Sequence, residues 1–182
     1  MHPHEALFLR SFLLPQLQSE QSVTAKIIRA VPPGQDAFQP NPKAKSAFGL
    51  AWHIAVCEIW IFDGVLHRQF GETADRPEAV TTCAHVADWY DANFAERIPF
   101  LESLSSEDLI TRVEFNGLRN DPAVAYLGIA MRHAIHHRGQ LSTYLRAMDA
   151  HVPAIYVESA DEPWPPAPAS PAAATGQSPP AF

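Results

Sequence analysis

The chain has 182 residues, 47% of them hydrophobic and 18% charged, and a formal net charge of −7 at pH 7. A chain of this length and composition is expected to fold as a soluble globular domain with a sizeable core. The negative charge and the lack of a Lys/Arg-rich run argue against a nucleic-acid-binding protein, because phosphate neutralisation requires a basic face.

Targeting signals and cysteines indicate where the protein works. No apolar stretch reaches the roughly 18 residues that a membrane span requires, and the N-terminus lacks the basic region of a signal peptide. The two cysteines, Cys57 and Cys83, both fall in helical patterns, so a disulfide framework is not expected. We therefore expect a protein of the reducing cytoplasm that binds neither nucleic acid nor a membrane.

The first half of the chain predicts two long helices. The first covers 5–31, where apolar residues recur at helical spacing, and Pro15 is expected to kink it. Residues 35–45 are expected to form an irregular loop. The second helix covers 46–70, with Ser46 as its N-cap. Because this helix is apolar on nearly every side, it is expected to be buried at the centre of the domain or covered by a partner subunit.

The middle of the chain predicts a third helix and a short extended segment. The helix is expected over 76–104, with Pro77 in its first turn, where proline is well tolerated. Residues 111–115 alternate in polarity and are expected to be extended, and Asn116 and Gly117 mark a turn.

The last part of the chain predicts a fourth helix and a tail. The helix is expected over 121–149, because Asp121 can cap it and Pro122 suits its first position. Residues 161–182 are rich in proline and alanine and cannot build a core. Four long helices with long connections predict an all-α four-helix bundle over residues 1–160, followed by this tail, with any ligand site between facing helices.

Three histidines are the most informative residues of the sequence. His133 and His137 are four residues apart, so they lie one turn apart on one face of the fourth helix. His53 belongs to the second helix. Three imidazoles suit a divalent metal ion, and such a set leaves coordination positions open to water or substrate, as catalytic sites do. We therefore predict His53, His133 and His137 as metal ligands. The alternative, which the residues alone leave open, is that all three are buried, hydrogen-bonded histidines of the core.

Two neighbours of these histidines leave alternatives open. Cys57 follows His53 by four residues and shares its helix face, so it is an alternative fourth ligand that would close the site. The other interpretation of Cys57 is a small buried hydrophobic residue. His136 points about 100° away from His137 around the helix, so it is expected outside the ligand set.

Four more residues have a functional and a structural interpretation. Glu58 and Asp63 are alternative hydrogen-bond partners for a ligand imidazole, although solvated or interface charges are the favoured interpretation. Arg138 suits an anionic substrate, but a structural ion pair is favoured. Gly139 lies inside a helix, where glycine costs about 1 kcal/mol relative to alanine, so it is expected to mark a tight helix crossing.

Three runs of sequence carry a resemblance to a known family. They are His133-Ala134-Ile135-His136-His137-Arg138-Gly139-Gln140, Leu50-Ala51-Trp52-His53-Ile54-Ala55 and Pro153-Ala154-Ile155-Tyr156. Together they resemble the DinB family of metal-dependent four-helix bundles, over roughly residues 5–160. The first run is the most specific of the three.

This resemblance implies a bundle that holds one divalent transition metal (nickel, zinc, iron or manganese) with three histidines, commonly as a homodimer. It also implies a metal-dependent transferase-like or hydrolase-like enzyme, such as a thiol S-transferase or a thiol-dependent isomerase. The partners would then be a small-molecule thiol and an electrophile. The alternative is a non-catalytic bundle in which the metal stabilises a dimeric ligand-binding or scaffold protein. The substrate and a general acid or base are not predicted.

Overall fold

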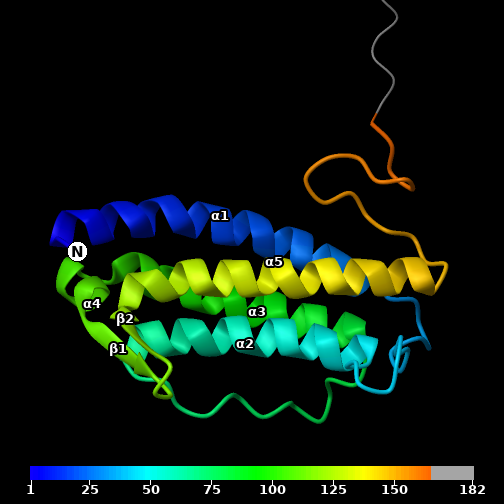
Figure 1. The fold of residues 1–182 in the computed structure, drawn as a ribbon, viewed down its shortest axis with the longest axis horizontal. Coiled ribbons are helices and arrows are strands. Elements are labelled where there is room, and N and C mark those ends of the chain that lie inside the picture. The colour runs from blue at the N-terminus through cyan, green and yellow to red at the C-terminus, as the bar shows by residue number, and fades with distance from the viewer. Residues whose placement is uncertain (165–182) are drawn as a thin grey trace, which may run out of the picture.

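The chain folds into a four-helix bundle (Figure 1), and the computed structural model describes residues 1–164. The four long helices are α1 (Pro3–Arg29), α2 (Ala47–His67), α3 (Cys83–Ser103) and α5 (Ala123–Ala147). The connection from α3 to α5 contains a short helix, α4 (Ser106–Ile110), and two strands, β1 (Arg112–Phe115) and β2 (Arg119–Pro122). The predicted all-α bundle is confirmed, with a small hairpin added to it.

The packing of the helices places α5 between α1 and α2. Both α5 and α3 pack against α1 and against α2. In Figure 1, α5 runs in front of α3, with α1 above and α2 below. One side of α5 therefore meets α1 and another meets α2, and these two sides carry different polar groups.

The second helix, α2, belongs to the core of the bundle. Its N-cap is Ser46, as predicted, and the Ser46 hydroxyl accepts a hydrogen bond from the Gly49 amide at 3.0 Å. With 21 residues and a mean hydropathy of 1.4 over its most apolar window, α2 is long and apolar enough to cross a membrane, so the expectation that no segment meets this criterion is wrong. However, 61% of its most apolar window is buried inside the bundle, which is the position of a core helix.

The end of α2 depends on a close backbone approach. The helix ends at His67 and not near residue 70, because Arg68 adopts the left-handed conformation with φ of 56°. The chain then turns back, and the ring of Phe70 packs directly on Gly64, where an added Cβ would overlap that ring. Any larger residue at position 64 would displace Phe70.

The third helix begins seven residues later than predicted, at Cys83 instead of residue 76. Pro77 lies in a turn, since its carbonyl accepts a hydrogen bond from the Val80 amide at 2.9 Å. The N-cap is Thr82, whose hydroxyl accepts from the His85 amide at 3.2 Å. The Thr82 hydroxyl satisfies an amide of the first turn of α3, which has no partner within the helix. A proline in the first turn provides no such hydrogen bond, so the helix starts at the capping residue.

The hairpin before α5 was predicted in part. Residues 111–115 are largely extended as β1, and Asn116 and Gly117 form the predicted turn with φ of 50° and 70°. The second strand was missed. Its residues, Arg119 to Pro122, pair antiparallel with β1. Asp121 and Pro122 therefore belong to the strand and not to the helix, and α5 begins two residues later than predicted, at Ala123.

The segment after α5 returns to the bundle. Glu162 pairs with Lys26 of α1 at 2.8 Å, and Asp161 pairs with Arg146 of α5 at 2.9 Å. These two acidic residues lie at the start of the predicted tail, 161–182. Residues 165–182 of that tail lie outside the described part of the chain.

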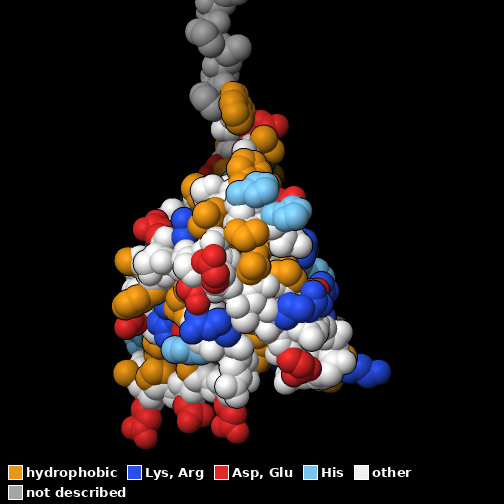
Figure 2. Space-filling model, turned by 90° about the vertical axis from the view of Figure 1, so that its left-hand side faces the viewer, with side chains coloured by type: hydrophobic (Ala, Val, Ile, Leu, Met, Phe, Trp, Pro, Cys, Tyr) orange, Lys and Arg blue, Asp and Glu red, His pale blue; other side chains and the backbone are white. Residues whose placement is uncertain are grey.

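One end of the bundle is formed by the start of α1, by α4 and by the hairpin. Figure 2 shows that the Lys and Arg side chains of this end are interspersed with acidic and hydrophobic ones. The visible face therefore offers no continuous basic surface of the kind that a phosphate backbone requires.

Candidate metal centre

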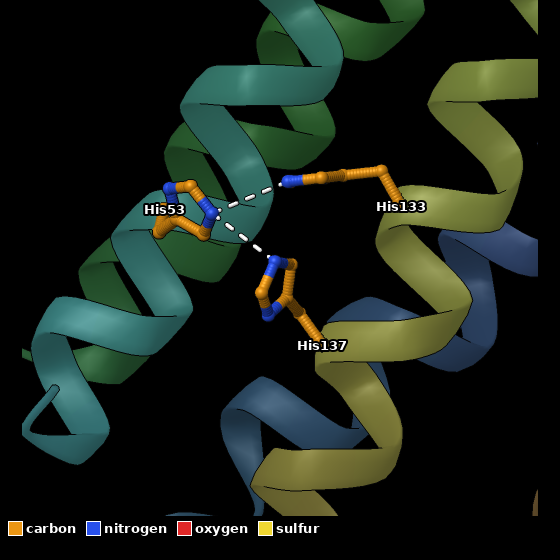
Figure 3. Close-up of side chains that lie close together, drawn as sticks. All are labelled: His53, His133 and His137. Atoms are coloured by element: carbon orange, nitrogen blue, oxygen red, sulfur yellow. Dashed lines mark hydrogen bonds between the residues drawn. The ribbon is translucent and has the colours of Figure 1, made fainter. Parts of the chain in front are cut away.

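The seam between α2 and α5 brings three imidazoles together (Figure 3). His133 and His137 project from consecutive turns of α5 toward His53 on α2. The Nε2 atom of His53 lies 3.2 Å from Nε2 of His137 and 3.2 Å from Nε2 of His133. All three nitrogens fall within 4.8 Å of one another. The structure thus juxtaposes the three residues that the sequence singles out.

The separation of the nitrogens suits a first-row divalent ion. Two nitrogens that each lie about 2.0–2.1 Å from one ion are roughly 2.9–3.4 Å apart when the angle at the ion is about 90–110°. The two 3.2 Å separations fall within this range. Three imidazoles also form a donor set that suits zinc, iron and nickel. The residues present therefore fit a divalent transition metal.

Burial keeps two of the imidazoles in their neutral form. Desolvation, followed by electrostatic repulsion from His137, lowers the pKa of His53 and of His133 to about 4. Lys45 adds a smaller effect at His53. Both rings are therefore neutral at pH 7, and the neutral imidazole is the form that offers a lone pair to a metal.

Cys57 contacts the far side of the His53 ring. Its Sγ atom lies 3.3 Å from Nδ1 of His53, whereas the other histidines face Nε2. Burial raises the pKa of the Cys57 thiol, so the sulfur stays protonated at neutral pH. When His53 donates its Nδ1–H to this sulfur, the Nε2 lone pair is free to face the cluster. The contact makes Cys57 a positioning neighbour, not a fourth member of the cluster.

Gln140 holds the His137 ring in the corresponding way. Its Oε1 atom accepts a hydrogen bond from Nδ1 of His137 at 2.8 Å, and its Nε2 donates to Nε2 of His136 at 3.2 Å. His136 therefore lies outside the cluster, as predicted. The role of Gln140 was missed, although its spacing of three residues from His137 is a signal for side-chain contact on a helix.

His133 differs from the other two histidines. Its Nδ1 atom is buried and has no hydrogen-bond partner among the described residues. With Nε2 facing the cluster, Nδ1 carries the proton of the neutral ring. A buried donor without a partner costs about 1–3 kcal/mol.

The two acidic residues of α2 do not contact the imidazoles. Glu58 is 1% exposed and accepts a hydrogen bond from the Tyr90 hydroxyl, and desolvation raises its pKa to about 8. Asp63 pairs with Arg97 at 2.8 Å. The favoured prediction of a solvated or interface charge is therefore wrong for Glu58, because the sequence did not show that α3 covers this side of α2.

Arg138 faces α1, away from the histidine cluster. Its side chain is buried, donates to Glu20 at 2.6 Å and to the Tyr156 hydroxyl at 2.7 Å, and lies near Thr24. The predicted structural ion pair is confirmed. The prediction for Gly139 is wrong, since an added Cβ there would meet nothing within 4 Å.

Two cavities adjoin the cluster. The first has a volume of about 250 Å³ and is lined by His133 and Cys57 together with a mostly apolar wall. The second has a volume of about 330 Å³ and is lined by His137 and Gln140, with Lys45 and Tyr144 among its polar residues. Small molecules in these cavities would lie beside different members of the same cluster.

A four-helix bundle with three converging imidazoles between facing helices belongs to the class of bundles that can hold a metal or cofactor in their core. A model of the DinB family matches residues 7–167, so the chain belongs to the DinB family. This family is generally metal-associated.

Solved structures give the same fold. The chain is similar to a DinB-like protein from Bacillus subtilis, with 22% identity and a TM-score of 0.66, over 79% of this chain and 96% of that one. It is also similar to a DinB-like protein from Bacillus cereus, with 26% identity and a TM-score of 0.67, over 79% of this chain and 95% of that one. No curated protein matches the sequence.

Proposed function

We propose that the protein is a metal-dependent enzyme in which His53, His133 and His137 hold one divalent transition metal, namely nickel, zinc, iron or manganese. The observation that carries this proposal is the convergence of three Nε2 atoms, with the Nε2 atom of His53 3.2 Å from each of the other two. When bound, such an ion would act as a Lewis acid and lower the pKa of a bound water or thiol toward neutrality.

The surrounding residues support a working site more than a closed structural one. Cys57 and Gln140 orient two of the imidazoles through their Nδ1 atoms, which is a common arrangement around metal-binding histidines. The set of three protein ligands leaves coordination positions for water or substrate. The cavities beside His133 and His137 give small molecules room next to the cluster.

The reaction we propose is the transfer of a small-molecule thiol onto an electrophile, or an isomerisation that uses such a thiol. Membership of the DinB family and the two cavities that adjoin one cluster support this class of reaction. The alternative is a non-catalytic, metal-stabilised bundle. It is supported by the position of the cluster at the seam of α2 and α5, where an ion would tie the two helices together.

Elemental analysis of protein purified without a His-tag tests the metal centre. We expect about one equivalent of a single transition metal, lost in His53→Ala and in His137→Ala. The matched control is His136→Ala, which removes an imidazole from the same helix but not from the cluster and should retain the metal. Absence of metal after reconstitution with nickel or zinc would overturn the proposal.

A thiol-consumption assay separates the enzyme from the scaffold. The metal-loaded protein is incubated with cysteine and 1-chloro-2,4-dinitrobenzene, and thioether formation is followed by absorbance. We expect a rate that depends on the metal and is lost in His137→Ala but kept in His136→Ala. A protein that binds metal, gains stability from it and gives no rate with a panel of thiols and electrophiles would favour the scaffold.

We also propose that the protein forms a homodimer in the cytoplasm. The stacked rings of Phe8 and Phe12 on α1 are 66% and 56% exposed, and exposed aromatic clusters of this kind are often covered by a partner. Light scattering coupled to size-exclusion chromatography should give twice the chain mass of 20.1 kDa. A single-chain mass at micromolar concentration would contradict the dimer.

A further inference from the structure

We propose that the cavity lined by His137 and Lys45 binds a thiol that carries a carboxylate, with the Lys45 ammonium on the carboxylate and the sulfur directed toward the histidine cluster. This inference rests on the proposed function and deepens it, because it narrows the small-molecule thiol to a chemical class. It follows from the position of Lys45, from the polarity of the cavity wall and from the charges of the described residues around it.

Lys45 is in line with the cluster along α2. It lies just before this helix begins, and Lys45, Gly49, His53 and Cys57 follow one another at intervals of four residues. A Cβ added at Gly49 would lie 3.7 Å from the Cβ of Lys45, so glycine leaves the space beside the lysine stem open. Desolvation is the main cause of the lowered pKa of His53 and of the raised pKa of Cys57, and the positive charge of Lys45 lowers both values. The charge of Lys45 therefore reaches the cluster.

The wall of this cavity combines one positive charge with neutral polar groups. Lys45 is the one Lys, Arg, Asp or Glu among the described residues that line it. Asn41, Gln140 and Thr143 supply amide and hydroxyl groups, and the volume of about 330 Å³ accommodates a small molecule. An anion in the cavity would therefore meet a cation and no carboxylate of the wall.

The ammonium of Lys45 is available to such an anion. The ion pairs among residues 1–164 do not include Lys45, whereas the guanidinium of Arg138 is paired with Glu20 inside the bundle. Lys45 is also exposed, so a ligand can reach it from solvent. A ligand carboxylate would displace only water from this ammonium.

The chemistry of the cavity favours a carboxylate over a phosphate. One ammonium matches the single charge of a carboxylate. A phosphate carries more charge and is commonly held by the planar fork of an arginine, which the described wall does not contain. With its carboxylate on Lys45, a short thiol would place its sulfur beside His137 in the same cavity. The sulfur would then bind the proposed ion and release its proton to the buffer.

The test compares two thiols of the same length on cobalt-loaded protein. 3-Mercaptopropionate carries a carboxylate, and 3-mercaptopropionamide carries a neutral amide in its place. Binding of sulfur to cobalt(II) produces a charge-transfer absorbance, which gives the Kd of each thiol. We expect the preference for the carboxylate to be about fivefold larger in the wild type than in Lys45→Met, which is the upper end for an ion pair that water reaches. The comparison between the two proteins cancels the intrinsic difference between the thiols.

Two further variants check that the charge at this position is responsible. Lys45→Arg keeps the positive charge and should keep the preference. The matched control is Lys43→Met, which removes an exposed lysine two residues away that does not line the cavity and should also keep it. The cobalt stoichiometry of each variant reports whether its cluster is intact. Equal preference in the wild type and Lys45→Met, or the same loss in Lys43→Met, would overturn the proposal.

Metal-free protein separates this inference from the metal centre. With ¹³C-labelled leucine methyl groups, 3-mercaptopropionate should shift Leu50, which lines the cavity, and not Leu66, in a groove between α2 and α3. The shift should be lost in Lys45→Met. Such shifts in a protein that binds no cobalt would refute the metal centre and keep the carboxylate site. One equivalent of cobalt with no preference that depends on Lys45 would refute the carboxylate site and keep the metal centre.

Discussion

His137 and Arg138 are neighbours in sequence, yet they lie in two differently built regions of α5. On the side that faces α1, Arg138 has Glu20 at 2.6 Å and the Tyr156 hydroxyl at 2.7 Å. On the side that faces α2, the Nε2 atom of His137 meets another imidazole nitrogen at 3.2 Å. One region pairs its charge within the chain, and the other brings imidazole nitrogens together.

The comparison distinguishes a polar group that stabilises the fold, Arg138, from a polar group suited to bind a ligand, His137. A buried charge that is paired and hydrogen-bonded holds helices in one arrangement, and removal of one partner leaves the other uncompensated. Converging imidazole nitrogens form a donor set that suits a divalent cation supplied from outside the chain. The same helix thus carries a group that the fold needs and a group that a ligand needs.

Replacing Arg138 should give the largest loss of stability. Arg138→Met leaves the Glu20 carboxylate without its cationic partner. The free energy of unfolding, measured by urea denaturation, should fall by about 3–5 kcal/mol. Arg29→Met is the control. Arg29 pairs with Asp88 and Asp91 at the surface, where the expected loss is under about 1 kcal/mol. Equal losses in both variants would remove the distinction between the two regions.

Metal addition should give the next largest effect, through the histidine side. Zinc at about 100 times its dissociation constant should raise the free energy of unfolding by about 2.7 kcal/mol and the Tm by roughly 5–10 °C. Differential scanning calorimetry should show that His133→Ala loses most of this increase and His136→Ala keeps it. An undiminished shift in His133→Ala would contradict the ligand assignment.

Urea denaturation of the wild type and of Glu58→Gln at a series of pH values tests a second buried polar group, the Glu58 carboxyl. Because burial raises the pKa of Glu58 from 4.5 to about 8, the folded chain binds this proton more tightly than the unfolded chain. The neutral carboxyl makes its full contribution to the free energy of unfolding below pH 4.5, and this contribution is lost as the pH rises through 8. The wild type should therefore lose up to ~1.4 kcal/mol per pH unit relative to Glu58→Gln across this window. Parallel stability profiles would show that Glu58 is not held neutral.

The smallest effect is expected at Gly139, beside Arg138. Gly139→Ala should raise the free energy of unfolding by roughly 0.5–1 kcal/mol, because the added Cβ meets nothing within 4 Å and alanine is the better helix former. Gly64→Ala is the opposite control, since its Cβ would overlap Phe70 and should destabilise the protein. Destabilisation by Gly139→Ala would restore the tight crossing that the sequence suggested.

The parts of the fold and site that sequence predicts are those set by spacing along one helix. A separation of four residues determines that His133 and His137 share a face, whatever covers that face. The amphipathic pattern likewise predicts four long helices and hence a bundle. Position 53 followed from the resemblance and from the requirement that a second helix supply the third nitrogen.

The parts that sequence does not predict depend on which helix covers which face. The helical wheel places Glu58 away from His53 but does not show that α3 buries it beside Tyr90. It also does not name Glu20 and Tyr156 as partners of Arg138, because they lie 118 and 18 residues away. The start of α3 at Cys83 was missed because two local signals, Pro77 and Thr82, competed and the hydroxyl cap prevailed.

The shared use of α5 links the two regions through helical register. Insertion or deletion of one residue between His133 and His137 would rotate the following residues by about 100° relative to the preceding ones. Such a change would separate His133 from His137 and swing the guanidinium away from Glu20 at the same time. This stretch of α5 should therefore tolerate many single substitutions but no change in length.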